Sequence, residues 1–154
     1  MNELAAEVLR RLKGKTLVTA ESCTGGGIGA ALTAIAGSSS VYKGGVICYC
    51  DDVKAQTLGV SREVLKRHGA VSEPVAAQMA ERCRKLLQAD ICLSVTGLAG
   101  PDGDGSGYRV GTVFIGYESE TDRIVRKFVF SGDREAVRRQ AICAALQMVL
   151  EYQK

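Results

Sequence analysis

Apolar residues recur along this chain with two periods, and the periods predict alternating helices and strands. Residues 2–13 place Leu4, Val8 and Leu12 on one helical face, with charged residues on the other. Further helices are predicted over residues 25–36, 51–58, 61–67, 73–88 and 133–152. Strands are predicted over Thr16–Ala20, Gly44–Cys50, Ile91–Thr96, Val110–Glu118 and Arg123–Phe130.

The order of these elements indicates the fold class. Helices connect the first three strands, whereas the turn at Ser119–Asp122 joins the last two as a hairpin. Crossover helices together with a hairpin predict a three-layer α/β/α fold on a mixed sheet. The chain has 154 residues, no internal repeat and no linker rich enough to divide it, so residues 1–154 are expected to form a single domain.

Composition narrows the classes of function. Hydrophobic residues make up 46% and charged residues 24%, as in an ordinary globular protein. The net charge is only +3 and aromatic residues are 5%, which disfavours a nucleic-acid binder. No apolar run approaches the roughly 20 residues of a membrane span, and the first residues lack the apolar core of a signal peptide. We therefore expect a cytoplasmic protein with no membrane and no nucleic-acid partner.

The residues that bind metals do not form a recognisable set. Of six cysteines, Cys48 and Cys50 form a C-x-C pair, but no second pair or nearby histidine completes a zinc site. Asp102 and Asp104 loosely resemble a calcium loop, yet Val113 stands where the bidentate glutamate belongs. We expect no metal and no cofactor, with most cysteines acting as small buried hydrophobes.

A glycine-rich turn lies between the first strand and the second helix. It runs from Glu21 through Ser22, Cys23 and Thr24 into a run of glycines that starts at Gly25. A strand, a glycine turn and a helix start together favour an anion cradle of backbone N–H groups. The same residues match a short dinucleotide fingerprint, and close packing of a helix on a strand remains a third explanation.

A serine cluster and a lysine offer a second kind of chemistry. Ser38, Ser39 and Ser40 precede the second strand, and Lys54 follows it. A serine hydroxyl becomes a nucleophile when a neighbouring base takes its proton, and a buried lysine can act as that base. The alternative is that Lys54 is an ordinary solvated lysine. His68, the only histidine, is expected at a helix end and not in a catalytic triad.

Six sequence blocks spread through the chain form a recognisable set. They are Ala20-Glu-Ser-Cys-Thr-Gly-Gly, Ala36-Gly-Ser-Ser, Gly69-Ala-Val-Ser-Glu-Pro-Val, Thr96-Gly-Leu-Ala-Gly-Pro, Val110-Gly-Thr-Val and Ser131-Gly-Asp-Arg-Glu-Ala-Val-Arg. In this order, over about Leu4 to Tyr152, they resemble the blocks of the CinA C-terminal domain family.

This resemblance implies an activity and a set of catalytic residues. It implies a stand-alone nicotinamide-nucleotide amidase, which hydrolyses nicotinamide mononucleotide to nicotinic acid mononucleotide and ammonia. By the same resemblance Ser39 is the nucleophile and Lys54 its base. Tyr49 is a second proton donor to the leaving ammonia, and Ser22 relays or orients through a hydrogen bond.

The resemblance also suggests where the substrate binds. Arg134, together with Thr24, Gly25 and Gly26, is expected to clamp the ribose phosphate. Thr96 and Gly97 are expected to line the substrate site. The small-molecule substrate is the predicted partner, together with further copies of the chain, because the 25–36 helix is apolar on all sides.

Two departures from the family pattern leave rival functions open. The usual Tyr-Ser-Asn-Glu block reads Tyr49-Cys-Asp-Asp52, and the usual Lys-Pro before Val110 is Tyr108-Arg109. A homologue that binds the nucleotide without turning it over is therefore the main alternative. An oxidoreductase that uses the glycine fingerprint to hold NAD(H) is the third class.

Overall fold

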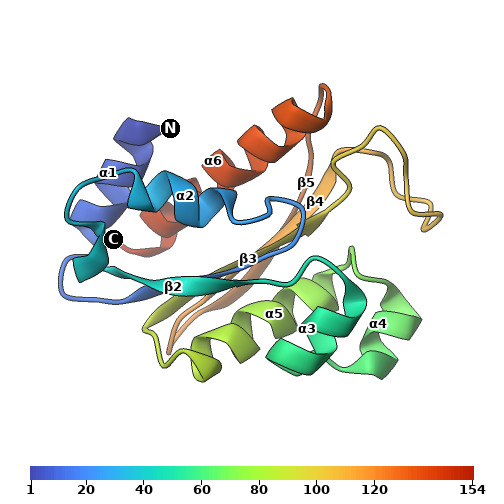
Figure 1. Ribbon diagram of the computed structural model, residues 1–154, viewed down its shortest axis with the longest axis horizontal. Helices are drawn as coiled ribbons and strands as arrows, with labels where there is room; N and C mark the ends of the chain where they lie inside the picture. The colour runs from blue at the N-terminus through green and yellow to red at the C-terminus, as the bar shows by residue number, and fades with distance from the viewer.

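The computed structural model describes residues 1–154 and contains one five-stranded sheet covered by helices (Figure 1). The strands are β1 (Leu17–Glu21), β2 (Tyr42–Ile47), β3 (Ile91–Gly97), β4 (Thr112–Glu118) and β5 (Arg123–Val129). The helices are α1 (Asn2–Arg11), α2 (Gly27–Thr33), the 3₁₀ helix η1 (Ser38–Ser40), α3 (Asp51–Leu58), α4 (Arg62–His68), α5 (Glu73–Leu86) and α6 (Arg134–Tyr152).

The sheet is mixed, which confirms the predicted fold class. Its strand order is β2-β1-β3-β4-β5. β1 runs parallel to both β2 and β3, whereas β4 is antiparallel to both of its neighbours, β3 and β5. The two parallel pairings come from the segments with crossover helices, and the β4–β5 pairing comes from the hairpin. The carboxyl ends of β1, β2 and β3 therefore lie at the same edge of the sheet.

Helices cover both faces of the sheet and make three layers (Figure 1). α1, α2 and α6 pack on one face, and α3, α4 and α5 lie on the other. Neighbouring residues of a strand point to opposite layers: in β3, Leu93 belongs to the core under α6 and Cys92 to the core over α5. β1 and β3 are buried on both faces, which explains why their sequences are apolar without alternation.

Most predicted elements differ from the structure by at most two residues at an end, and two elements differ by more. The helix predicted over 25–36 is only α2, because Gly25 and Gly26 adopt positive φ angles of 57° and 97° in the turn before it. The strand predicted over Gly44–Cys50 lies two to three residues earlier, as β2.

The surroundings of α2 also change one expectation. Ile28, Gly29, Ala31 and Leu32 are buried against the rest of the chain, while Ala30 and Thr33 are exposed. Packing on β1 and α6 thus accounts for most of its apolar character without another subunit. None of the helices is long and apolar enough to span a membrane.

Candidate active site

Ser22 lies where the central parallel strand β1 ends. Its backbone N–H donates to the Val95 carbonyl of β3 at 2.9 Å, so the start of the turn is held by the sheet. Ligand sites in open α/β sheets form beyond the carboxyl ends of parallel strands, because the loops there diverge. Ser22 occupies that position, and only 7% of its surface is exposed.

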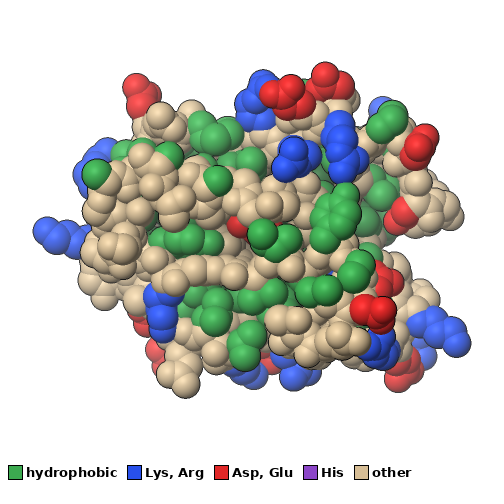
Figure 2. All heavy atoms as spheres, viewed as in Figure 1, with side chains coloured by type: hydrophobic (Ala, Val, Ile, Leu, Met, Phe, Trp, Pro, Cys, Tyr) green, Lys and Arg blue, Asp and Glu red, His purple; other side chains and the backbone are tan.

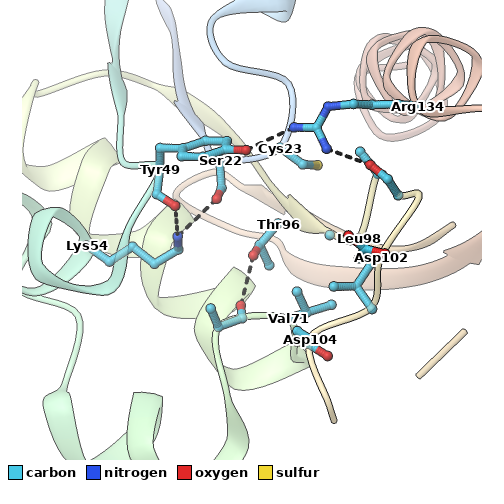
Figure 3. A pocket seen from close by; sticks show the side chains of 14 residues that line it. Ser22, Cys23, Tyr49, Lys54, Val71, Thr96, Leu98, Asp102, Asp104 and Arg134 are labelled. Carbon is cyan, nitrogen blue, oxygen red and sulfur yellow. Dashed lines mark hydrogen bonds between the residues drawn. The ribbon is translucent and has the colours of Figure 1, made fainter. Parts of the chain in front are cut away.

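Lys54 reaches Ser22 from α3, the helix that follows the neighbouring strand β2 (Figure 3). It lies in α3, and its side chain is 1% exposed. Its Nζ donates to Ser22 Oγ at 3.0 Å and to the carbonyl oxygens of Cys48 at 2.8 Å and Tyr49 at 3.5 Å. Three oxygens therefore surround the amine, and one of them is a serine hydroxyl.

The environment of Lys54 suits a base better than an ion-pair partner. No carboxylate lies within ion-pairing distance of its Nζ. A neutral amine has two N–H groups, which the Cys48 and Tyr49 carbonyls can accept, and one lone pair. In this neutral form, with both N–H groups directed to the carbonyls, the Ser22 hydroxyl donates to the lone pair, whereas an ammonium donates to Ser22 Oγ. This arrangement can remove a proton from Ser22.

The structure does not bring Ser39 to Lys54. Ser39 is exposed in η1, before the first residue of β2, while Lys54 comes after the strand's last residue. A strand of six residues is roughly 20 Å long, so the two side chains lie at opposite ends of it. The expected Ser39–Lys54 pair is therefore corrected: within this chain the serine that contacts Lys54 is Ser22.

A cavity of about 270 Å³ opens in front of Ser22 and Lys54 (Figure 3). Its size is close to the lower end for small-molecule sites. Thr96 and Gly97, which are expected from the sequence to line a substrate site, both lie in its wall. The Thr96 hydroxyl donates to the Ala70 carbonyl at 2.8 Å, so it holds the wall formed by the segment before α5. The remaining lining residues are Cys23, Tyr49, Ala70, Val71, Leu98, Ala99, Gly100, Asp102, Asp104 and Arg134.

Arg134 joins two sides of the cavity mouth. From the start of α6, its guanidinium donates to the Gly100 carbonyl at 2.7 Å and to the Tyr49 hydroxyl at 3.0 Å. Tyr49 is 60% exposed beside the opening. Because Tyr49 accepts this hydrogen bond, its own O–H proton is free to donate to a substrate. Both residues were predicted, and both line the cavity.

The anion cradle predicted at the glycine turn is occupied by the chain itself. Glu21, 1% exposed, accepts from the backbone N–H groups of Ile28 at 2.8 Å and Gly29 at 3.1 Å, at the start of α2. Its carboxylate also accepts from the hydroxyls of Thr24 at 2.7 Å and Thr19 at 3.1 Å. The amide groups that would hold a phosphate are thus already paired with a carboxylate.

Three residues that were expected to bind the substrate belong to this turn and do not line the cavity. Thr24 is fully buried with its hydroxyl on Glu21, and Gly25 and Gly26 form the turn behind it. None of the three lines the cavity in front of Ser22. The geometry therefore gives them a role in building the turn rather than in contacting a ligand there.

Cys23 is the other nucleophilic side chain in the cavity. Burial raises the pKa of its thiol to about 11, and the nearby Arg138 and Lys54 only partly offset this. The reactive form of cysteine is the thiolate, which is scarce near neutral pH when the pKa is that high. Ser22, with an amine at hydrogen-bond distance, is the better placed nucleophile.

Some cavity residues were not assigned a role from the sequence. Asp102 and Asp104 were considered only as a failed calcium loop, yet both line the mouth. The hydrogen bond from Ser106 lowers the pKa of Asp104. No group of three or more His, Cys, Asp or Glu side chains is placed to hold a metal. Arg138 has no role predicted from the sequence, although from α6 it donates to the carbonyls of Cys23 and Thr24.

Comparison with known proteins identifies the family of this site. The sequence profile of the CinA C-terminal domain matches residues 1–153. The chain belongs to the CinA C-terminal domain family. It is 47% identical over 148 residues to the nicotinamide-nucleotide amidohydrolase PncC of Escherichia coli K12, an alignment that covers 94% of this chain and 90% of that protein.

Longer relatives and solved structures agree with this membership. A CinA-like protein of Thermotoga sp. RQ2 is 42% identical over all of this chain, which spans 37% of its length. A CinA superfamily protein from Klebsiella pneumoniae 700603 superposes with a TM-score of 0.96 at 38% identity, covering 99% of this chain and 96% of that one. One from Escherichia coli gives 0.95 at 35% identity, covering 97% and 88%.

Proposed function

We propose that this CinA-family chain hydrolyses the carboxamide of nicotinamide mononucleotide, giving nicotinic acid mononucleotide and ammonia, with Ser22 as nucleophile and Lys54 as base. The observation that carries the proposal is the 3.0 Å contact between Lys54 Nζ and Ser22 Oγ inside a cavity. The name of the Escherichia coli relative supports the substrate and the reaction class.

The first step forms a covalent bond to the substrate. Lys54, as the neutral amine, takes the proton of the Ser22 hydroxyl, and Oγ attacks the carboxamide carbon. The carbonyl oxygen becomes an oxyanion, and Lys54 carries the transferred proton as an ammonium. The Cys48 and Tyr49 carbonyls hold the amine in place during this transfer.

The second step releases ammonia and then the acid. The Lys54 ammonium gives its proton to the amide nitrogen as the C–N bond breaks, so ammonia leaves and an ester remains on Ser22. Water then attacks this ester, with Lys54 again taking a proton. The proton returns to Ser22 Oγ as nicotinic acid mononucleotide departs. One water is consumed and one ammonia is released, and no redox partner is needed.

Residues at the mouth are proposed to bind the rest of the nucleotide. The Arg134 guanidinium has five N–H donors, and its bonds to Gly100 and Tyr49 leave others for a phosphate. Tyr49 can donate its free O–H to the substrate beside it. Thr96 and Gly97 form the inner wall, where the planar pyridine ring would lie.

The test of this function is ammonia release from nicotinamide mononucleotide. We expect turnover by the wild type and losses of at least about 10²-fold in Ser22→Ala and Lys54→Ala, the smallest cost of removing a proton-transfer group. Ser39→Ala is the matched control, because it removes a hydroxyl from the same chain outside the cavity. Its rate should stay within about threefold of wild type, whereas a loss as large as that of Ser22→Ala would restore Ser39 as nucleophile.

The same assay separates the enzyme from its main alternative. A nucleotide-binding module would bind nicotinamide mononucleotide, measured by calorimetry, without releasing ammonia. Retention of Ser22, Tyr49 and Lys54 in one cavity favours the enzyme, even though Cys50 and Asp51 replace the residues usual in the family.

Self-association and compartment remain predictions about this chain. β2 is an edge strand, and Ile47 near its end is 56% exposed. The face over β2 and α2 in Figure 2 carries few charged side chains, which suits contact with a second copy. Light scattering that gives the mass of a monomer would exclude the homo-oligomer. The cytoplasm stays the expected compartment.

A further inference from the structure

The backbone carbonyls of the Ser22 turn are all paired. The Ser22 carbonyl accepts from the Gly25 N–H at 3.0 Å, and the Glu21 carbonyl accepts from Cys48 at 2.9 Å. The next two carbonyls point to one side chain of α6: Arg138 Nε donates to the Cys23 carbonyl and Nη2 to the Thr24 carbonyl, both at 3.1 Å. The turn is therefore fixed from the sheet and from α6.

The backbone N–H groups of the same turn are not all paired. Those of Ser22, Gly25 and the first residues of α2 donate to carbonyls or to Glu21. The N–H groups of Cys23, Thr24 and Gly26 donate to no oxygen of the chain. Buried backbone donors are nearly always paired in folded proteins, so a donor left free at a site points to a ligand.

Only one of these three free donors belongs to a residue of the cavity. Cys23 lines the cavity beside Ser22 and is 6% exposed, whereas Thr24 and Gly26 do not line it. The Cys23 N–H does contact the residue's own thiol sulfur, but sulfur is a weak acceptor. An acyl group on Ser22 Oγ would bring its oxygen next to the N–H of the following residue, as happens when a nucleophile sits on a sharp turn after a strand.

We propose that the backbone N–H of Cys23 stabilises the oxyanion formed on the carboxamide, and that Arg138 is the positioning residue that holds the turn carrying this N–H. The inference rests on the proposed function. Arg138 itself does not line the cavity, so it acts through the turn and not on the substrate. The Cys23 N–H shares a planar trans peptide with the Ser22 carbonyl, which accepts from the Gly25 N–H. Arg138 holds the two peptide planes that follow, through the Cys23 and Thr24 carbonyls. The donor thus needs no reorganisation when the negative charge develops.

The decisive experiment replaces single backbone amides by esters through the α-hydroxy analogue of one residue. The ester at Cys23 removes the proposed donor, and kcat for ammonia release should fall about 10²–10³-fold with KM changed less than about threefold. The ester at Thr24 is the matched control, because it removes the neighbouring unpaired N–H, which belongs to a residue outside the cavity, and keeps the Cys23 N–H. Its loss should stay below about tenfold. Equal losses in the two esters, or full activity of the Cys23 ester, would overturn the assignment.

A side-chain series tests the positioning role of Arg138. In Arg138→Met, kcat per folded enzyme should fall at least about tenfold, with KM nearly unchanged. Arg138→Lys should recover part of the lost kcat, because an ammonium can hold one of the two carbonyls. Far-ultraviolet circular dichroism gives the folded fraction. A rise in KM alone would overturn the positioning role. A failure of the proposed function itself gives other results: the wild type would release no ammonia, or Ser22→Ala would remain active.

Discussion

The Glu21 carboxylate accepts the Ile28 backbone N–H at 2.8 Å, so a side chain from the end of β1 closes the start of α2. A glycine-rich turn at a helix start is commonly a site for an external anion. Here the anion is internal, and it sits one residue before the proposed nucleophile. The turn is consequently rigid before any substrate arrives, and the substrate phosphate must be bound elsewhere.

Replacing Glu21 by Gln should destabilise the fold. Glutamine keeps the size of the side chain but offers one acceptor oxygen, while Glu21 accepts four hydrogen bonds with little exposure to water. The expected loss is about 1–3 kcal/mol in the free energy of unfolding, measured by urea denaturation. Glu73→Gln, at an exposed first-turn position of α5, is the control and should cost less than about 1 kcal/mol. Equal losses would show that the buried network does not stabilise the turn.

Replacing Lys54 by Met should separate stability from catalysis. Methionine fills similar space without an amine, so the protein should fold and unfold at a temperature close to that of wild type. Ammonia release should fall at least about 10²-fold, because no other base lies at Ser22. Lys43→Met is the control, since the Lys43 amine donates to carbonyls at the surface after α5. A Lys54→Met protein with near wild-type turnover would remove Lys54 from the mechanism.

Removing the Tyr49 hydroxyl should weaken substrate binding more than it slows the chemistry. Tyr49→Phe loses the oxygen that accepts from Arg134 and the proton that faces the mouth. We expect KM for nicotinamide mononucleotide to rise about three- to tenfold while kcat stays within about threefold. Steady-state kinetics check this. A large fall in kcat at constant KM would instead make Tyr49 the acid that protonates ammonia.

The buried Cys23 thiol should resist alkylation until the solution is strongly basic. Its pKa is raised to about 11, so at pH 8 only about one thiol in a thousand is ionised. Raising the pH toward 11 increases the thiolate fraction, and the rate should climb through that window. Iodoacetamide followed by mass spectrometry should label the exposed Cys50 first at pH 8. Rapid labelling of Cys23 at pH 8 would contradict the raised pKa and reopen it as a nucleophile.

Most of the fold was accessible from the sequence because its strands and helices are strongly patterned. α3, predicted over 51–58, has those limits in the structure, and the mixed sheet followed from the hairpin turn at Ser119–Asp122. The errors lie where local patterns compete with tertiary contacts. Gly25 and Gly26 look like the start of an apolar helix, but their positive φ angles make them a turn that brings Glu21 onto α2.

The sequence named several residues that line this cavity, but it did not show which of them are in contact. Ser22, Tyr49, Lys54 and Arg134 were all named from the sequence, and the structure places them around one cavity. The positions of Lys54 and the serine cluster on either side of β2 suggested that they act together, and the family resemblance named Ser39 within that cluster. A strand separates its two flanks by its own length, so the residue that meets Lys54 comes from the neighbouring parallel strand.

The position of the chain ends relative to the cavity has a practical meaning. In Figure 1 both termini lie at the left, beside α1 and the end of α6, while α3, the start of α6 and the loop after β3 surround the cavity at the right. A tether attached at either end would leave the mouth open to substrate. The same catalytic unit can therefore be carried as one module of a larger polypeptide, without any redesign of its working parts.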